Sequence, residues 1–316
     1  MTEKKIEIFK RNIKKYKDFI RCPLCGSIFD MADMAGMTES TYSSFLKCRS
    51  NHTYDISKKG YVNLFNGQTK ITKTYDKHLF SARKIISDSG FYGLLTQKLF
   101  DVLNINNINH AAILDAGCGC GNLTYDIFKR IYDAEDTEQN PIFAIDLSKD
   151  GIDFAAGNFC GDNLLWIVGN LNNLPLSDNK FGVILNIMSP ANYSEFKRIL
   201  KQDGILIKVL SDSDYLKELR RFIYKENDKN EYSNKAVLTH LEENAKDLSI
   251  DIMDIIDLKY VHAVKKSDIP ALFDMTPLTL NIHGREQVKD KLIASLNETN
   301  DFEVTLAFKI AVCKKL

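Results

Sequence analysis

The sequence predicts an α/β fold, in which a mostly parallel sheet with helices on both faces follows a small cysteine-containing domain. Three observations lead to this prediction. From about residue 93 onward, short apolar runs alternate with helix-compatible segments, which is typical of a parallel sheet. A glycine-rich turn at residues 117–121 follows the first of these runs. Before residue 60, three cysteines and a histidine form two closely spaced pairs.

The amino-acid composition narrows the class of protein. The chain has 316 residues, of which 44% are hydrophobic and 27% charged, enough apolar material for a sizeable core. The sequence contains no 18-residue uncharged apolar window and no apolar signal core near Met1, so we expect neither a membrane span nor secretion. Seven unevenly clustered cysteines favour a reducing compartment, and we therefore expect a cytoplasmic protein.

The net charge of zero hides an asymmetry along the chain. Residues 1–90 contain 17 Lys and Arg against 9 Asp and Glu, a net charge of +8, which leaves −8 for residues 91–316. Basic halves of this kind often contact nucleic acid or an anionic surface. An ordinary solvated face gives the same count, so charge alone leaves the partner open.

Four segments follow from the pattern along the chain. Residues 1–21 form a basic N-terminal extension whose apolar residues recur at helical spacing, which predicts an amphipathic helix. Residues 22–65 form the cysteine-containing domain, residues 66–92 a polar connector, and residues 93–316 the α/β domain. The strands of this last domain are expected at 111–115, 142–146, 164–168, 182–186 and 205–210, with a late antiparallel pair at 250–264 and 302–312. Helices are expected at 192–200, 267–275 and 285–296.

The cysteine cluster has the spacing of a metal site. Cys22-Pro-Leu-Cys25 and Cys48-Arg-Ser-Asn-His52 each place two ligands on a short turn. Four Cys and His ligands make a closed tetrahedral zinc site, which leaves no position for a catalytic water. The sequence therefore predicts one structural Zn²⁺, the alternative for the first pair alone being a redox couple.

Basic and aromatic residues surround this cluster. Such a mixture suits phosphate contact with base stacking, although aromatic residues can equally form the core of so small a domain. The basic residues are Lys47, Arg49, Lys58 and Lys59, and the aromatic ones are Tyr54, Tyr61 and Phe65.

The glycine-rich turn joins the first strand to a helix. Gly117, Gly119 and Gly121 have the G-x-G-x-G spacing of S-adenosylmethionine (SAM) methyltransferases, whereas a dinucleotide-binding loop needs glycine at position 122, where Asn122 stands. Asp115 before the loop can hold the methionyl ammonium. The other expected cofactor contacts follow later strands, with a carboxylate for the ribose and an amide for the adenine. They are Asp146, Leu147, Asn170, Leu171 and Asn186. We expect this pocket to be built from residues beyond 113.

Together these features resemble one family, the bacterial 23S rRNA guanine-N1 methyltransferases. The resemblance runs from Arg21 to the C-terminus, and its most specific motif is Lys59-Gly-Tyr-Val-Asn-Leu64. It implies a Rossmann-like SAM domain, a zinc domain that helps to grip an rRNA hairpin, and dimers in some members. The further matching motifs are Cys22-Pro-Leu-Cys25, Cys48-x3-His52 with Asp55, Ser81-Ala-Arg83, Gly90-Phe-Tyr92, Leu114 to Gly121, Ala144 to Lys149, Leu174-Pro175 and Met275-Thr-Pro277.

The chain departs from the family pattern in four places. Residues 1–20 precede the usual start, and the segment between the ligand pairs is longer than usual. The family's Gly-Asp-Ser is missing around Thr74-Tyr75-Asp76, and Ser189-Pro190 replaces Ala-Pro. The connector difference bears on the RNA contacts and on which guanine is methylated.

The resemblance implies methylation of guanine N1, which carries a proton at neutral pH. No general base is assigned from the sequence. Residues 186–192 are expected to line the base pocket, where Ser189 either bonds the guanine edge or stabilises its own turn. A paired guanine would have to leave its helix. Two alternatives remain: a SAM methyltransferase for a small molecule or protein with a purely structural zinc, and an RNA-binding protein with an inactive SAM fold.

Overall fold

The computed structural model describes residues 3–30, 45–65, 67, 77–105, 111–133, 141–224, 235–247, 250–279, 282–296 and 301–316. Part of the expected connector, residues 66 and 68–76, which include Thr74-Tyr75-Asp76, lies outside these residues. The strands are β1 (Phe29–Asp30), β2 (Phe45–Cys48), β3 (Thr53–Ser57), β4 (Tyr61–Asn63), β5 (Ile113–Ala116), β6 (Ile142–Asp146), β7 (Leu164–Val168), β8 (Phe181–Ile187), β9 (Leu200–Ser211), β10 (Ile250–Val264) and β11 (Phe302–Lys315). The helices are α1 (Lys5–Lys15), α2 (Lys77–Asp88), α3 (Gly93–Ile105), α4 (Asn122–Asp133), α5 (Lys149–Asn158), α6 (Tyr193–Ile199), α7 (Lys217–Tyr224), α8 (Lys235–Asp247), α9 (Ile269–Met275) and α10 (Arg285–Ser295).

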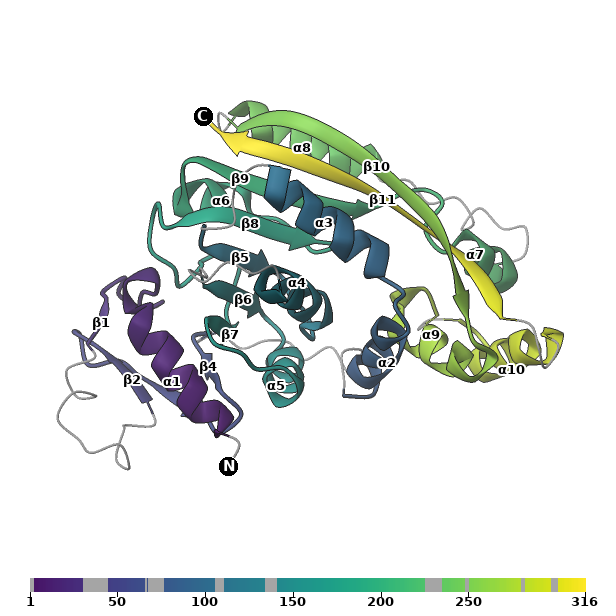
Figure 1. The fold of residues 1–316 in the computed structure, drawn as a ribbon, viewed down its shortest axis with the longest axis horizontal. Coiled ribbons are helices and arrows are strands. Elements are labelled where there is room, and N and C mark those ends of the chain that lie inside the picture. Colours follow the sequence, from purple (N-terminus) through teal and green to yellow (C-terminus); the bar gives the residue numbers. More distant parts are fainter. Residues whose placement is uncertain are drawn as a thin grey trace.

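Within the described residues, the strands form one sheet in the order β1-β2-β3-β4-β7-β6-β5-β8-β9-β11-β10 (Figure 1). Pairing is parallel from β4 to β9, and β10 and β11 form an antiparallel pair at one edge. The predicted α/β fold is confirmed, including the late strand pair. None of the helices in the described part of the chain is long and apolar enough to cross a membrane.

Helices cover both faces of the sheet because the strands bury alternate side chains on opposite sides. In β6, Ile142 and Ala144 belong to one hydrophobic cluster, together with Leu99 of α3. Phe143 of the same strand belongs to the other cluster, with Phe196 of α6 and parts of α1 and α8. The sheet thus has two separate cores, one on each face.

The N-terminal extension folds as the predicted amphipathic helix, α1. Its apolar residues Phe9 and Ile13 are buried against the sheet. Asn12 Nδ2 donates to the carbonyls of Gly161 and Leu164, at 3.0 and 3.1 Å, and so fixes the helix to the start of β7. The N-terminal extension is therefore packed into the same fold as the parallel sheet.

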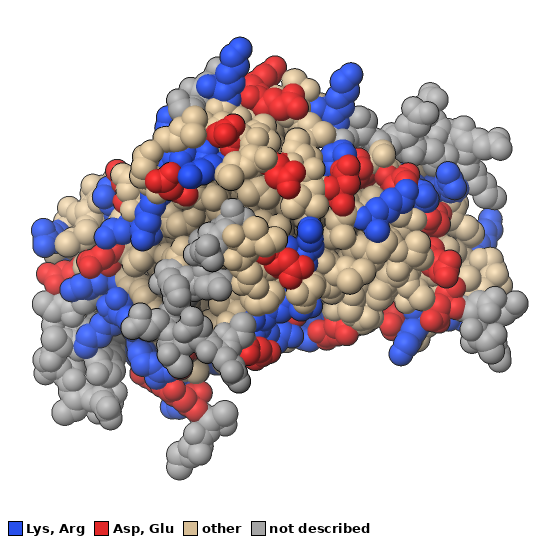
Figure 2. Space-filling model, turned by 45° about the horizontal axis from the view of Figure 1, so that its top comes forward, with Lys and Arg blue, Asp and Glu red and all other residues tan. Residues whose placement is uncertain are grey.

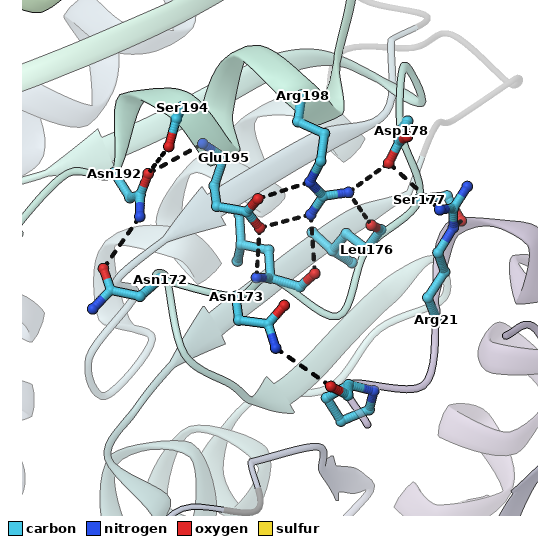
Figure 3. Close-up of polar contacts among 12 residues, drawn as sticks. Arg21, Asn172, Asn173, Leu176, Ser177, Asp178, Asn192, Ser194, Glu195 and Arg198 are labelled. Carbon is cyan, nitrogen blue, oxygen red and sulfur yellow. Dashed lines mark hydrogen bonds and ion pairs between the residues drawn. The ribbon is translucent and has the colours of Figure 1, made fainter. Parts of the chain in front are cut away.

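The cysteine-containing domain is continuous with the large sheet. Its last strand, β4, pairs in parallel with β7, with Val62 opposite Ile167. A polar network near the same border joins Arg21, just before this domain, and Pro23, at its start, to α6 and the residues that follow β7 (Figure 3). Arg198 bonds both oxygens of Glu195, at 2.7 and 2.8 Å, and contacts Asp178 at 2.6 Å. Asp178 also lies 3.6 Å from the guanidinium of Arg21.

The stretch expected as a connector contains a helix with a packed side. In α2, Leu79, Phe80 and Ile86 are buried, and the helix packs mainly against α9. Helices α2 and α9 lie together at one end of the molecule (Figure 1). Because α2 and α9 pack together, they bring two distant parts of the sequence to the same side of the glycine-rich turn.

Candidate functional site

The four predicted metal ligands come together at two tight turns. Gly26 adopts a φ of +70° after the first pair, and Asn51 adopts +64° within the second. The ligand atoms of Cys22, Cys25, Cys48 and His52 all lie within 4.8 Å of one another. Nδ1 of His52 is 3.5 Å from the sulfur atoms of both Cys22 and Cys48, and the Cys25 and Cys48 sulfur atoms are 3.7 Å apart.

These distances fit a tetrahedral zinc site. Bonds of about 2.0–2.3 Å to zinc give ligand–ligand edges of about 3.3–3.8 Å in a regular tetrahedron. Side-chain and backbone hydrogen bonds, first that from Ser27, lower the pKa of Cys25 to about 5, which favours the thiolate that zinc binds. The Tyr54 hydroxyl lies 3.3 Å from the Cys22 sulfur and fixes its position.

The aromatic residues near the cluster are mostly core. Tyr54 and Tyr61 are each only 6% exposed, and Tyr54 packs edge-on against Phe29. Of the basic residues, Lys59 forms a 2.5 Å ion pair with Asp153 of α5. On the face that Figure 2 shows, basic and acidic side chains are interspersed. The charge asymmetry of the sequence therefore does not produce a single basic surface on that face.

The remaining basic residues near the cluster are Lys47, Arg49 and Lys58. Arg49 and Lys58 are exposed, and Lys47 is partly buried on β2.

The glycine-rich turn leads from β5 into α4. All three glycines adopt left-handed backbone, with φ of +85° at Gly117, +59° at Gly119 and +78° at Gly121. A Cβ at Gly117 would lie 1.8 Å from the Ser189 hydroxyl oxygen, and one at Gly121 would lie 2.5 Å from the Trp166 ring. Glycine is therefore required here both for conformation and for space.

Two carboxylates support this turn. Asp146, at the end of β6, accepts hydrogen bonds from the backbone N–H of Gly119 at 2.8 Å and of Ser148 at 2.7 Å. Asp115 is buried, and its Oδ2 accepts from the Thr124 hydroxyl at 2.5 Å. Its Oδ1 has no hydrogen-bond partner in the described part of the chain. Burial raises the pKa of Asp115 to about 7.

A pocket of about 380 Å³ lies over the turn; we call it the cofactor pocket. Gly117 and Gly119 form its floor, and Tyr92 and residues 275–278 contribute to its walls. Arg83 and Arg220 are its only charged residues among those the structure describes. Because Arg83 and Tyr92 come from α2 and the turn after it, the expectation that residues beyond 113 alone build the pocket is wrong.

The pocket fits SAM in three respects. A glycine floor without Cβ atoms lets a ligand approach the backbone closely. Asp115, in β5 two residues before Gly117, has a buried oxygen without a partner among the described residues, and this oxygen can attract an ammonium. Arg83 places a cation within 3.7 Å of the Cβ position of Gly119, which suits a carboxylate. Burial raises the pKa of Cys118 well above its usual range, so this loop thiol is no ready nucleophile.

Comparison with known proteins decides the family. A family model described as a methyltransferase domain matches residues 108–268, and one described as the N-terminal domain of RlmA, a zinc ribbon, matches residues 20–73. A Bacillus subtilis (strain 168) protein, provisionally named a 23S rRNA (guanine-N(1)-)-methyltransferase, is 35% identical over 303 residues, which are 94% of this chain and 100% of that protein. The chain belongs to the 23S rRNA guanine-N1 methyltransferase family.

A second member of the family extends this finding. The 23S rRNA (guanine(748)-N(1))-methyltransferase of Streptomyces fradiae is 29% identical over 218 residues, which are 66% of this chain and 68% of that protein. The protein described here is accordingly a SAM-dependent methyltransferase with a zinc-binding domain.

The other residues expected to contact SAM in this methyltransferase lie at the ends of β6, β7 and β8. Leu147 is 40% exposed, and Leu171 is half-buried beside Gly117. The Asn170 side chain accepts a hydrogen bond from the backbone N–H of Asn172. Asn186, in contrast, is fully buried beneath the loop and donates to the carbonyls of Ala116 and Pro190. In this structure Asn186 holds the protein backbone.

Sequence reasoning missed the residue that bonds to Asn186 in this methyltransferase. Lys208 of β9 is 2% exposed, and its ammonium donates to Asn186 Oδ1 and to the carbonyl of Ser189. The signal was present as a single lysine inside the apolar run Ile205–Leu210. A charged residue at a position predicted as a buried strand requires a polar partner there.

Proposed function

We propose that this protein transfers the methyl group of SAM to N1 of a guanine in a 23S rRNA hairpin, in the cytoplasm. The observation that supports this most strongly is the combination of a cofactor pocket and a Cys3His cluster in one chain that matches a family member along 94% of its length. The proposed segments are the N-terminal extension (1–21), the zinc domain (22–65), the connector (66–92) and the methyltransferase domain (93–316).

We propose specific residues for each ligand. Zinc is held by Cys22, Cys25, Cys48 and His52. SAM is held by Asp115, Gly117, Gly119, Gly121, Asp146, Leu147, Asn170 and Leu171, with Asn186 acting through the loop that it fixes. Arg83 joins this set as the partner of the SAM carboxylate, because it lines the cofactor pocket with its guanidinium 3.7 Å from the Cβ position of Gly119.

The chemistry assigned to the protein is orientation and electrostatics. Bound SAM supplies an activated methyl group. The glycine turn, fixed by Asp146, holds the methionyl end in place, and this positioning can supply much of the rate enhancement. Residues of α2, α7 and 275–278 form walls of the pocket beside the bound cofactor. In the zinc domain, Lys47, Arg49 and Lys58 are proposed to contact rRNA phosphates.

The test is transfer of radiolabelled methyl groups from SAM to undermethylated 23S rRNA, with mapping of the product. A single guanine methylated at N1 supports the proposal. Labelling of a small molecule or protein, with rRNA unlabelled, would favour the alternative in which zinc is purely structural. SAM binding without any transfer would favour the RNA-binding alternative. Light scattering in the same preparation tests whether the protein forms a homodimer.

A further inference from the structure

A second pocket lies on the other side of the loop that follows β8. It has a volume of about 420 Å³ and is lined in part by Lys208, after which we name it the Lys208 pocket. It shares Met188 and Ser211 with the cofactor pocket, so the two pockets have a common wall. None of the residues proposed to bind SAM or zinc lines this second pocket.

Lys208 gives this pocket an unusual electrostatic character. Its side chain is almost fully buried, and two of its three N–H donors bond to Asn186 and Ser189. Within the described residues, the third donor has no acceptor, and no carboxylate forms an ion pair with the ammonium. A buried cation without a counter-ion is costly unless its donors are satisfied. An acceptor on a ligand would complete its hydrogen bonding.

The walls of the pocket suit a flat ring. The rings of Tyr193 and His240 lie 5.6 Å apart and are tilted by 51°. Pro190 adds an apolar surface, and Met188 is 38% exposed at the wall shared with the cofactor pocket. Aromatic and apolar side chains of this kind stack on unpaired RNA bases. Among the bases, guanine presents O6 as an acceptor, and a lysine commonly donates to it.

Building on the proposed function, we infer that the Lys208 pocket receives the target guanine, with the Lys208 ammonium donating a hydrogen bond to O6. N1 is bonded to the ring carbon that carries O6. A guanine held through O6 at Lys208 can therefore turn its N1 edge toward the wall formed by Met188 and Ser211. Beyond that wall is the cofactor pocket, from which the methyl group comes.

With the guanine in this position, the reaction does not need a general base, and none is assigned from the sequence. When the N1 proton leaves to solvent, the negative charge is shared between N1 and O6, and a cation at O6 stabilises it. The N1 lone pair then forms the bond to the methyl carbon. The carbon–sulfur bond breaks with its electron pair staying on sulfur, so the products are N1-methylguanine, S-adenosylhomocysteine and one proton.

The test combines a change in the RNA with a change in the protein. The RNA is a 23S hairpin carrying the guanine mapped as above, or 2-aminopurine, which lacks O6, at that position. Binding is measured with S-adenosylhomocysteine present, for the wild type and for Lys208→Met. We expect the wild type to prefer guanine by about 10-fold or more, and Lys208→Met to bind both hairpins equally. Lys201→Met, an exposed change on the same strand, should keep the wild-type preference.

A second readout separates chemistry from stability. The single-turnover rate of Lys208→Met should rise with pH at a higher range than that of the wild type, since N1 then loses its proton unaided. If Lys208→Met does not fold, Lys208→Gln keeps a donor to Asn186 without the charge and is compared in the same way. A folded variant with an unshifted pH profile and an unchanged preference for O6 overturns the inference. A wild type that does not methylate rRNA would overturn the proposed function as well.

Discussion

Val62 of the zinc domain pairs in parallel register with Ile167 of the methyltransferase sheet, and both side chains are fully buried. The border between the two proposed domains therefore runs through a hydrogen-bonded ladder rather than through a linker. Removing the first domain exposes the edge of β7 and its apolar side chains to water.

A chain that starts at residue 93 should accordingly lose SAM binding, contrary to what an independent domain would do. It lacks β4 at the sheet edge, and it lacks Arg83 and Tyr92 in the cofactor pocket. Calorimetry with S-adenosylhomocysteine and size-exclusion chromatography measure the two effects. The full-length variant Arg83→Gln measures the effect of losing this pocket residue while β4 stays in place. A truncated chain that is monomeric and binds normally would contradict the expectation.

Cys48→Ser should lose the metal, because Cys48 contributes one of the four clustered ligand atoms. Elemental analysis of purified protein is expected to fall from one zinc per chain to near zero. Hydrogen exchange should quicken in β2 and β3 but less in β4, which β7 still holds. Cys160→Ser changes an exposed cysteine outside the cluster and should alter neither measurement. Absence of zinc or any other tetrahedral metal from the wild type would refute the metal assignment.

Asp146→Ala should weaken SAM binding and also lower the stability of the unliganded protein. The carboxylate holds the N–H groups of Gly119 and Ser148, and hydrogen bonds to a charged group contribute about 1.5–3 kcal/mol each. Thermal unfolding without ligand and calorimetry with SAM report the two effects. Asp150→Ala, an exposed change four residues later, should cost less than about 1 kcal/mol. An unliganded Asp146→Ala protein as stable as the wild type would show that the turn does not depend on this carboxylate.

Asp115→Asn should change how stability depends on pH. Burial raises the pKa of Asp115 to about 7, so between about pH 4 and pH 7 the folded protein holds a proton that the unfolded chain releases. This group's contribution to stability is full below about pH 4 and falls as pH rises toward 7. Denaturant unfolding at pH 5 and pH 7 should show a smaller loss for Asp115→Asn than for the wild type. Parallel pH dependences in the two proteins would mean that Asp115 is charged when folded.

Lys58→Gln should weaken rRNA binding more than Lys59→Gln, although both remove one positive charge. Lys58 is exposed, whereas Lys59 is paired with Asp153. Loss of one phosphate contact should reduce the slope of log affinity against log salt by about 1. Filter binding of an rRNA hairpin over a range of salt concentrations measures this slope. Equal slopes for the two variants would exclude Lys58 as a phosphate contact.

The parts of the fold that follow local patterns were predictable. Apolar runs placed β6, β7 and β10 at their observed bounds, and the Cys and His spacing identified the cluster. Contacts between distant segments were not predictable in this way. The G-x-G-x-G spacing gives the floor of the cofactor pocket, but nothing near it in sequence indicates that Arg83 lies above Gly119.

Asn186 shows the same limit. Its position at the end of the expected fourth strand suggested a cofactor contact. In the structure, its amide oxygen accepts a hydrogen bond from Lys208 on the neighbouring strand, and its amide nitrogen donates to the carbonyl of Ala116.

The parallel pairing of β4 with β7 also sets an order of events during synthesis. Residue 63 leaves the ribosome about 100 residues before residue 164, and at roughly 5–20 residues per second this gap lasts about 5–20 s. During that time the strand Tyr61–Asn63 has no partner on one side. A zinc ion bound early would keep the preceding hairpins folded and present this strand to β7 when it emerges. The metal would then act in the timing of assembly, before any RNA is bound.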